Sequence, residues 1–106
     1  MADETPKKKP GQLNIELPED VAEGIYSNLA IISHSNSEFI IDFLRLVPNV
    51  PKAKVKARLI LTPSHTKRLL KALMDNIQKY EAQFGPIDEK DLPPFPPMNF
   101  TPKAQA

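Results

Sequence analysis

Cysteine is absent and glycine is scarce, with three glycines among 106 residues. The absence of cysteine excludes disulfides, thiolate metal sites and thiol nucleophiles. The glycines stand at positions 11, 24 and 85, too far apart to form a glycine-rich loop around a phosphate. The chain also lacks an apolar run near the roughly 18 residues of a membrane span, and its first residues lack the apolar stretch of a signal peptide. We therefore expect a cytoplasmic protein that does not contact membranes.

Neither sign of charge is in large excess. The chain has 14 Lys and Arg residues and 13 Asp and Glu residues, for a net charge of +1. This balance excludes a uniformly basic nucleic-acid coat and an acidic tail protein. The two signs are nevertheless segregated along the chain. Six acids and no base lie between Pro10 and Leu44, whereas eight bases and no acid lie between Phe43 and Met74. Such segregation favours pairing between copies, in which the acidic segment of one chain meets the basic segment of another.

Proline marks the boundaries of the expected domain, because six of the 12 prolines lie at or after Pro86. We expect a disordered N-terminal arm at residues 1–11, a single α+β domain at residues 12–85 and a Pro-rich C-terminal tail at residues 86–106. The tail places three apolar anchors between its prolines, namely Phe95, Met98 and Phe100. An extended polyproline II conformation there leaves three outcomes open: docking within the oligomer, disorder, or binding to a groove on another protein.

Alternation of apolar and polar residues predicts strands in the first part of the domain. The four expected strands cover residues 13–17, 25–33, 38–47 and 52–61. Pro18 and residues 48–51 interrupt the alternation, and the run from Ser33 to Ser37 has the composition of a hairpin turn. Because the connections are short, the strands are expected to form an antiparallel meander.

One long helix is predicted after the strands, and residues with known capping preferences mark both of its ends. Thr62 occupies the N-cap position, Pro63 the first helical position, and Gly85 ends the helix. Its apolar stripe consists of Leu70, Leu73, Ile77, Tyr80 and Phe84, flanked by Leu69 and Met74. The predicted fold is therefore α+β, a four-stranded antiparallel meander sheet followed by one long C-terminal helix packed on one face.

The sheet face away from this helix is expected to carry apolar residues that one chain cannot cover. Its candidate interface residues are Ile32, Ile40, Asp42, Leu44 and Leu46. An apolar patch in contact with water marks an interface. We therefore expect a homo-oligomer with two-fold symmetry, either a dimer or a dimer of dimers.

Every second position of the last expected strand carries a base: Lys52, Lys54, Lys56 and Arg58. Their side chains are expected to share one face, and one interpretation is a ridge that binds an anion or an acidic partner. The other interpretation is structural: Asp42 lies opposite Lys56 or Arg58 and neutralises part of the ridge, while the lysines keep a sheet edge from pairing with other chains. No aromatic residues alternate with these bases, so nucleic acid is not the expected partner.

The polar turn after residue 33 brings His34 and Glu38 close together in the sequence. Serine, histidine and an acid are the ingredients of nucleophilic catalysis, but no second loop is available to form an oxyanion hole. A metal site that includes Asp42 is an alternative, although the spacing matches no metal signature. We expect these side chains to stabilise the turn, with His34 paired to Glu38. We therefore expect no catalytic residue, no metal, no cofactor and no enzymatic activity.

Five segments occur in a distinctive order: YSN (26–28), ISHS (32–35), EFIIDF (38–43), ARLILTP (57–63) and NIQKYEAQFG (76–85). In combination, over about residues 13–87, the chain resembles a family of small prokaryotic proteins classed only as a domain of unknown function, the DUF3467 type. The resemblance implies a short cytoplasmic strand-rich domain with a C-terminal helix, and it implies no activity. A weaker, fold-level similarity is to the export chaperone SecB, whose chain also ends in a Phe-Pro-rich segment like residues 95–100.

Together these patterns predict a non-enzymatic, self-associating protein-binding module. Two alternatives remain open at this point. One is a SecB-like chaperone that binds unfolded chains in an apolar groove beside the helix. The other is an anion or nucleic-acid binder that acts through the basic strand at residues 52–58.

Overall fold

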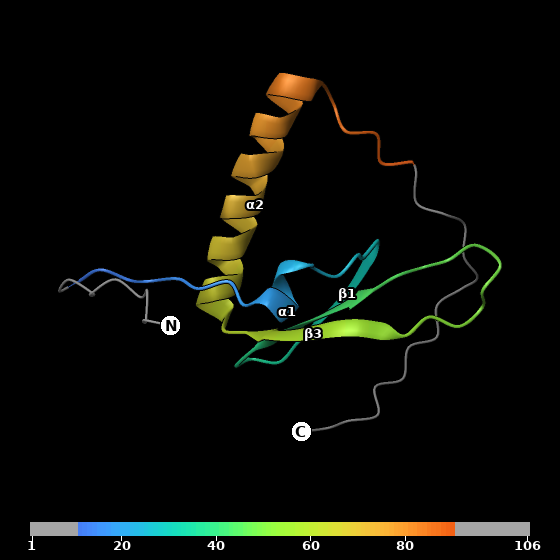
Figure 1. Cartoon of the computed structure of the whole chain (residues 1–106), viewed down its shortest axis with the longest axis horizontal. Helices are drawn as coiled ribbons and strands as arrows, with labels where there is room; N and C mark the ends of the chain where they lie inside the picture. Colours follow the sequence, from blue (N-terminus) through green and yellow to red (C-terminus); the bar gives the residue numbers. More distant parts are fainter. Residues whose placement is uncertain (1–10, 91–106) are drawn as a thin grey trace, which may run out of the picture.

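A computed structural model describes residues 11–90, which form a small antiparallel sheet followed by a long helix (Figure 1). The elements in chain order are α1 (Glu19–Ala22), β1 (Leu29–His34), β2 (Phe39–Leu44), β3 (Val55–Leu61) and α2 (Pro63–Phe84). The sheet has three strands in the order β1-β2-β3. The α+β class, the antiparallel sheet and the C-terminal helix are thereby confirmed. Residues 1–10 of the expected arm and the tail anchors Phe95, Met98 and Phe100 lie outside the described residues.

The register of the central strand β2 with its two neighbours assigns every strand residue to one of two faces. Ile41 lies opposite Ile32 of β1 and Leu59 of β3. Residues directly opposite each other in an antiparallel sheet point to the same side, so these three share one face, which we call the Ile41 face. Asp42 is the next residue along β2 and lies opposite Arg58. Since successive side chains alternate, this pair occupies the reverse side, which we call the Asp42 face.

The first expected strand, at residues 13–17, is not a strand. Residues 12–18 have no regular structure, are all exposed, and pair with neither edge of the sheet within the described part of the chain. Alternation favours an extended backbone, but a strand also needs a neighbouring strand with which to pair. The segment instead leads into α1, a single turn whose first residues are Glu19 and Asp20. The predicted four-stranded meander is therefore corrected to three strands.

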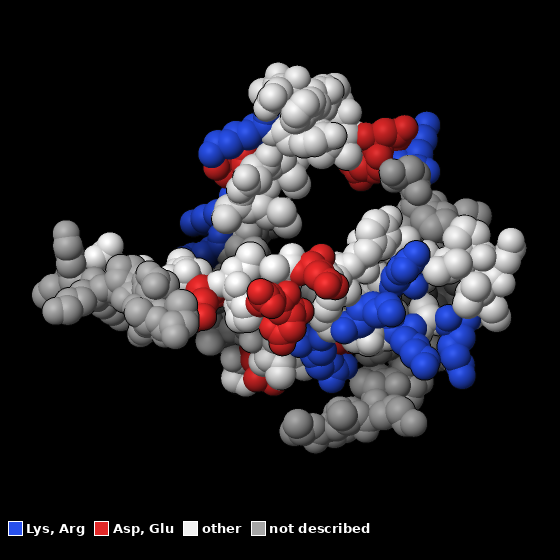
Figure 2. Space-filling model, viewed as in Figure 1, with Lys and Arg blue, Asp and Glu red and all other residues white. Residues whose placement is uncertain are grey.

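The expected packing of the helix on its own sheet is not found either. α2 starts at the end of β3 and points away from the sheet (Figure 1), and open space separates the two (Figure 2). None of the 22 residues of α2 is buried. Thr62 is the single residue between the last residue of β3, Leu61, and the first residue of α2, Pro63. The direction of the helix is therefore set at a very short junction.

The hydrophobic core is correspondingly small. Among residues 11–90 its members are Ile41 and Leu44 of β2, which are 7% and 5% exposed. Asp42 lies between them in the sequence and is 1% exposed, so the most buried side chain in this part of the chain is an acid. A sheet is stabilised by a second layer that covers its apolar side. The described residues provide no such layer.

Candidate protein-interaction site

The local structure at both ends of α2 explains why this segment is helical. The Thr62 hydroxyl accepts a hydrogen bond from the His65 N–H at 3.2 Å, and the Thr66 hydroxyl donates to the Thr62 carbonyl at 2.8 Å. Pro63 takes the first helical position, where its missing N–H costs nothing. Gly85 follows the last turn with a φ of 95°, a value that residues with a side chain rarely adopt. The predicted caps are confirmed.

One side of α2 is apolar from Leu69 to Phe84 and is exposed. The members of this α2 stripe are Leu69, Leu70, Leu73, Met74, Ile77, Tyr80 and Phe84, and their exposed fractions lie between 39% and 65%. The Tyr80 and Phe84 rings contact each other, with centroids 4.9 Å apart. Since no residue of α2 is buried, the stripe presents an apolar surface to solvent.

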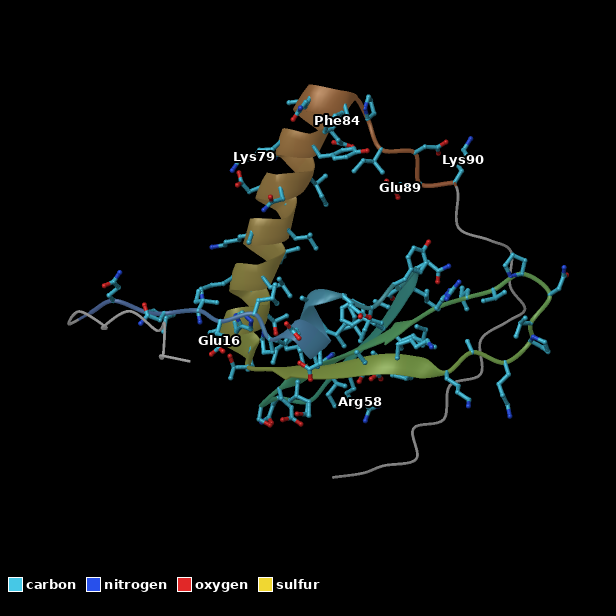
Figure 3. The ribbon with its side chains drawn as sticks, in the orientation of Figure 1. Glu16, Arg58, Lys79, Phe84, Glu89 and Lys90 are labelled. Atoms are coloured by element: carbon cyan, nitrogen blue, oxygen red, sulfur yellow. The ribbon has the colours of Figure 1, made fainter. Side chains whose placement is uncertain are left out.

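The Ile41 face of the sheet is also incompletely covered. Ile32 and Leu59, which flank Ile41 on either side, are 60% and 49% exposed. In Figure 3 Arg58 lies on the side of β3 away from α2. Since the Ile41 face is the opposite side of the sheet, it is turned toward the side on which α2 rises. Two exposed apolar surfaces therefore border the same open space.

The Asp42 face is organised around one ion pair. The Nε of Arg58 donates to Oδ1 of Asp42 at 2.7 Å, and Nη2 donates to Oδ2 at 2.9 Å. The hydrogen bond to Asp42 raises the pKa of Arg58 above its ordinary value, so the guanidinium stays charged. Such a bidentate pair satisfies the buried carboxylate and fixes the register of β2 against β3. The predicted cross-strand partner of Asp42 is thus found in Arg58.

The predicted ridge of four bases is divided by the structure. Lys52 and Lys54 precede β3, while Lys56 and Arg58 lie within it. The register shifts between Phe43 and Leu44 of β2, and the extra residue opposite this shift is Lys56. A bulge of this kind interrupts the alternation of side chains, so the four bases do not form one regular row. Figure 2 shows basic side chains gathered over the connection between β2 and β3 and acidic ones over α1.

The polar turn has a simpler role than the sequence suggests. The His34 ring stacks on Phe39, its partner in the register, with centroids 5.4 Å apart. Glu38 contributes its backbone carbonyl, which accepts from the Ser35 N–H at 3.0 Å, and Ser37 donates its N–H to the Ser35 hydroxyl at 3.3 Å. No ion pair joins His34 to Glu38 in the described part of the chain, so that predicted pairing is wrong. Nor do residues 11–90 hold a group of three or more His, Cys, Asp or Glu residues suited to a metal ion.

Two of the predicted interface residues are not where the sequence placed them. Ile32 lies opposite Ile41 and therefore on the other side of the sheet from Asp42. Leu46 follows the end of β2 and belongs to neither face. Ile40 and Leu44 do share the Asp42 face, as their spacing from Asp42 predicts. The displacement of Ile32 follows from the register of the hairpin, which alternation within one strand does not determine.

Sequence reasoning missed a polar clamp at the start of β1. The Asn28 side chain donates to the Leu46 carbonyl at 3.0 Å and accepts from the Leu46 N–H at 2.7 Å. The Ser27 hydroxyl donates to the Leu44 carbonyl at 2.8 Å, and the Arg45 guanidinium lies 5.6 Å from the centre of the Tyr26 ring. The clamp extends the β1–β2 pairing beyond Leu44. The signal that could have revealed it is the polar pair Ser27-Asn28 in an otherwise apolar strand pattern.

The chain is an α+β domain with a three-stranded antiparallel sheet, a long C-terminal helix and uncovered apolar faces on both. It belongs to the family described as "Protein of unknown function (DUF3467)", whose model matches residues 1–89. No curated protein and no solved structure matches the chain. No helix in residues 11–90 is long and apolar enough to cross a membrane.

Proposed function

We propose that this protein is a non-enzymatic, self-associating protein-binding module whose first partner is a second copy of the chain. The observation that carries the proposal is the exposure of the α2 stripe and of the sheet in a chain with only Ile41 and Leu44 as buried hydrophobic residues among those described. Large exposed apolar patches of this kind mark interaction sites.

The free energy that burial of the α2 stripe would contribute supports the proposal. Fully burying a Leu, Ile, Phe or Met side chain contributes about 1.5–3 kcal/mol. The seven residues of the α2 stripe are each about half exposed, so covering them would contribute roughly 5–10 kcal/mol. The whole stability of an ordinary domain is about 5–15 kcal/mol. The gain from covering the stripe is therefore as large as the net stability of an ordinary domain, before the entropic cost of association is subtracted.

A SecB-like chaperone would use the same surface in a different way. It would need the α2 stripe to remain uncovered in the assembled protein, so that an unfolded chain can bind there. The self-association proposed here covers the stripe instead. The two functions therefore differ in one assay, because a chaperone suppresses the aggregation of a denatured client and the module proposed here does not.

The proposal is tested by thermal unfolding at several protein concentrations. Because folding and association are coupled in an oligomer that lacks a stable single-chain core, we expect Tm to rise as the concentration increases. Circular dichroism of the full chain over a hundredfold range of concentration measures this. A Tm that stays the same across that range would contradict the proposal.

A further inference from the structure

We infer that two copies of this chain exchange their helices, so that α2 of each copy packs its stripe across the Ile41 face of the other. The inference rests on the proposed function and names the surfaces that meet. Each chain has a helix with an exposed apolar side and a sheet with an exposed apolar side. In a pair of chains, the helix of each copy can cover the sheet of the other.

The junction between β3 and α2 explains why the helix does not cover its own sheet. Only Thr62 separates the two elements. Its side chain caps the helix through His65, its carbonyl binds the Thr66 hydroxyl, and the ring of Pro63 restricts the next φ angle. Folding α2 back onto β3 would require these groups to rearrange. The conformation of the junction instead holds the helix away from the sheet that precedes it.

The side chains of α2 are oriented for such a contact. In Figure 3 Lys79 and Phe84 lie on different sides of the helix, with Lys79 on the outer side. Lys79 forms an exposed ion pair with Asp75, 3.0 Å long, which belongs to the polar side of α2. The α2 stripe and the Ile41 face thus border the open space visible in Figure 2. A helix from a second copy placed there would contact apolar side chains on both sides.

The contact is close in size to the smallest specific interfaces. The α2 stripe runs from Leu69 to Phe84, about 24 Å of helix, and with a width of about 10 Å it covers roughly 240 Å² on each of two facing surfaces. Two-fold symmetry repeats the contact, so roughly 960 Å² is buried in total, near the roughly 1,000 Å² that a specific interface needs.

Charge supports a second copy as the occupant. The first half of α2 carries the bases Lys67, Arg68 and Lys71 and no acid. α1, which lies on the same side of the sheet as α2 (Figure 1), carries Glu19 and Asp20 in its only turn. A helix that arrives from another copy therefore brings bases to the acidic border of the Ile41 face. Complementary charges of this kind favour one orientation of the pair.

The absence of cysteine from the chain allows a direct test by cross-linking. A full-length double variant carries Ile77→Cys, which places a thiol in the α2 stripe, and Leu59→Cys, which places one on the Ile41 face. Copies labelled with heavy isotopes and unlabelled copies of this double variant are unfolded together, refolded and treated with a short bis-maleimide. Mass spectrometry then identifies linked peptides. We expect links between positions 59 and 77 that join a labelled chain to an unlabelled one.

The matched control combines Leu59→Cys with Lys79→Cys, which places the second thiol on the outer side of the same helix. We expect this double variant to lose the link between two chains. Variants that assemble like the parent chain, but link only within one chain or link equally from Lys79→Cys, would overturn helix exchange and leave self-association intact. A parent chain that sediments as a single copy would overturn both the exchange and the proposed function.

Discussion

Asp42 illustrates at the scale of single residues how a charge can be buried where little hydrophobic core surrounds it. Its carboxylate is 1% exposed, and both oxygens accept hydrogen bonds from Arg58 on the neighbouring strand. A buried carboxylate is tolerated when it is paired in this way. The pair also discriminates between strand registers, because a shift by one residue would place Asp42 against an apolar neighbour.

Removal of the guanidinium by Arg58→Ala tests this role. The substitution leaves the Asp42 carboxylate buried without its partner. A buried carboxylate that loses its hydrogen-bond donors lowers the free energy of unfolding by about 2–3 kcal/mol. We expect a corresponding fall in the free energy of unfolding measured by urea denaturation. Lys56→Ala, on the same strand but without an ion pair in the described residues, is the control and should change stability by less than about 0.5 kcal/mol. Equal effects from the two substitutions would show that the pair has no special role.

The cross-strand partner of Asp42 was predicted correctly, although the connection was not. Asp42 was expected opposite Lys56 or Arg58 through a hairpin at residues 48–51, and Arg58 does lie opposite it. Residues 45–54 join the two strands, however, and the register shifts between Phe43 and Leu44. His34 was expected to pair with Glu38, but the register places Phe39 directly opposite His34. Proximity in the sequence is a weaker guide than the alternation of faces, because the stacking of His34 on Phe39 depends on which residues lie across the ladder.

At the scale of secondary-structure elements, α2 was predictable and its position was not. Its limits depend on local chemistry: the Thr62 cap, Pro63 at the first position and Gly85 after the last turn. Its packing depends on which surface covers the α2 stripe, and an amphipathic pattern is the same whether that surface belongs to the same chain or another. The prediction of a strand at residues 13–17 was wrong for a related reason, because alternation within a segment does not show whether a neighbouring strand is there to pair with it.

The element-scale prediction concerns Leu73, in the middle of the α2 stripe. Leu73→Glu replaces an apolar side chain with a carboxylate, which the helix tolerates but an apolar contact does not. We expect association to weaken by about 3 kcal/mol or more, a factor above roughly 100 in Kd. Analytical size-exclusion chromatography with light scattering measures this.

The control for Leu73→Glu is Gln78→Glu, which adds the same charge to the same helix outside the stripe. We expect Gln78→Glu to retain the mass of the parent chain at a concentration where Leu73→Glu dissociates. Retention of the parent mass by both variants would mean that the stripe lies outside the interface.

At the scale of the whole molecule, the groups that can stabilise the fold lie on two separate elements, the sheet and α2. The sheet contains the ion pair and two buried hydrophobic residues, Ile41 and Leu44, one on each face, whereas the apolar side chains of α2 lie outside it. The clamp formed by Asn28 and Leu46 strengthens the pairing of β1 with β2 but does not cover the apolar face of the sheet. This division is expected if the folded unit is an assembly of chains, since each surface then finds its counterpart in another copy.

Sedimentation equilibrium of the full-length chain at micromolar concentration shows whether a second copy covers the apolar faces of α2 and the sheet. A single copy has a mass of 11.9 kDa. Self-association predicts a species of at least twice that mass, with dissociation only on strong dilution. A homogeneous species with the mass of one chain would contradict it, because the apolar faces of the helix and sheet would then have no second copy to cover them.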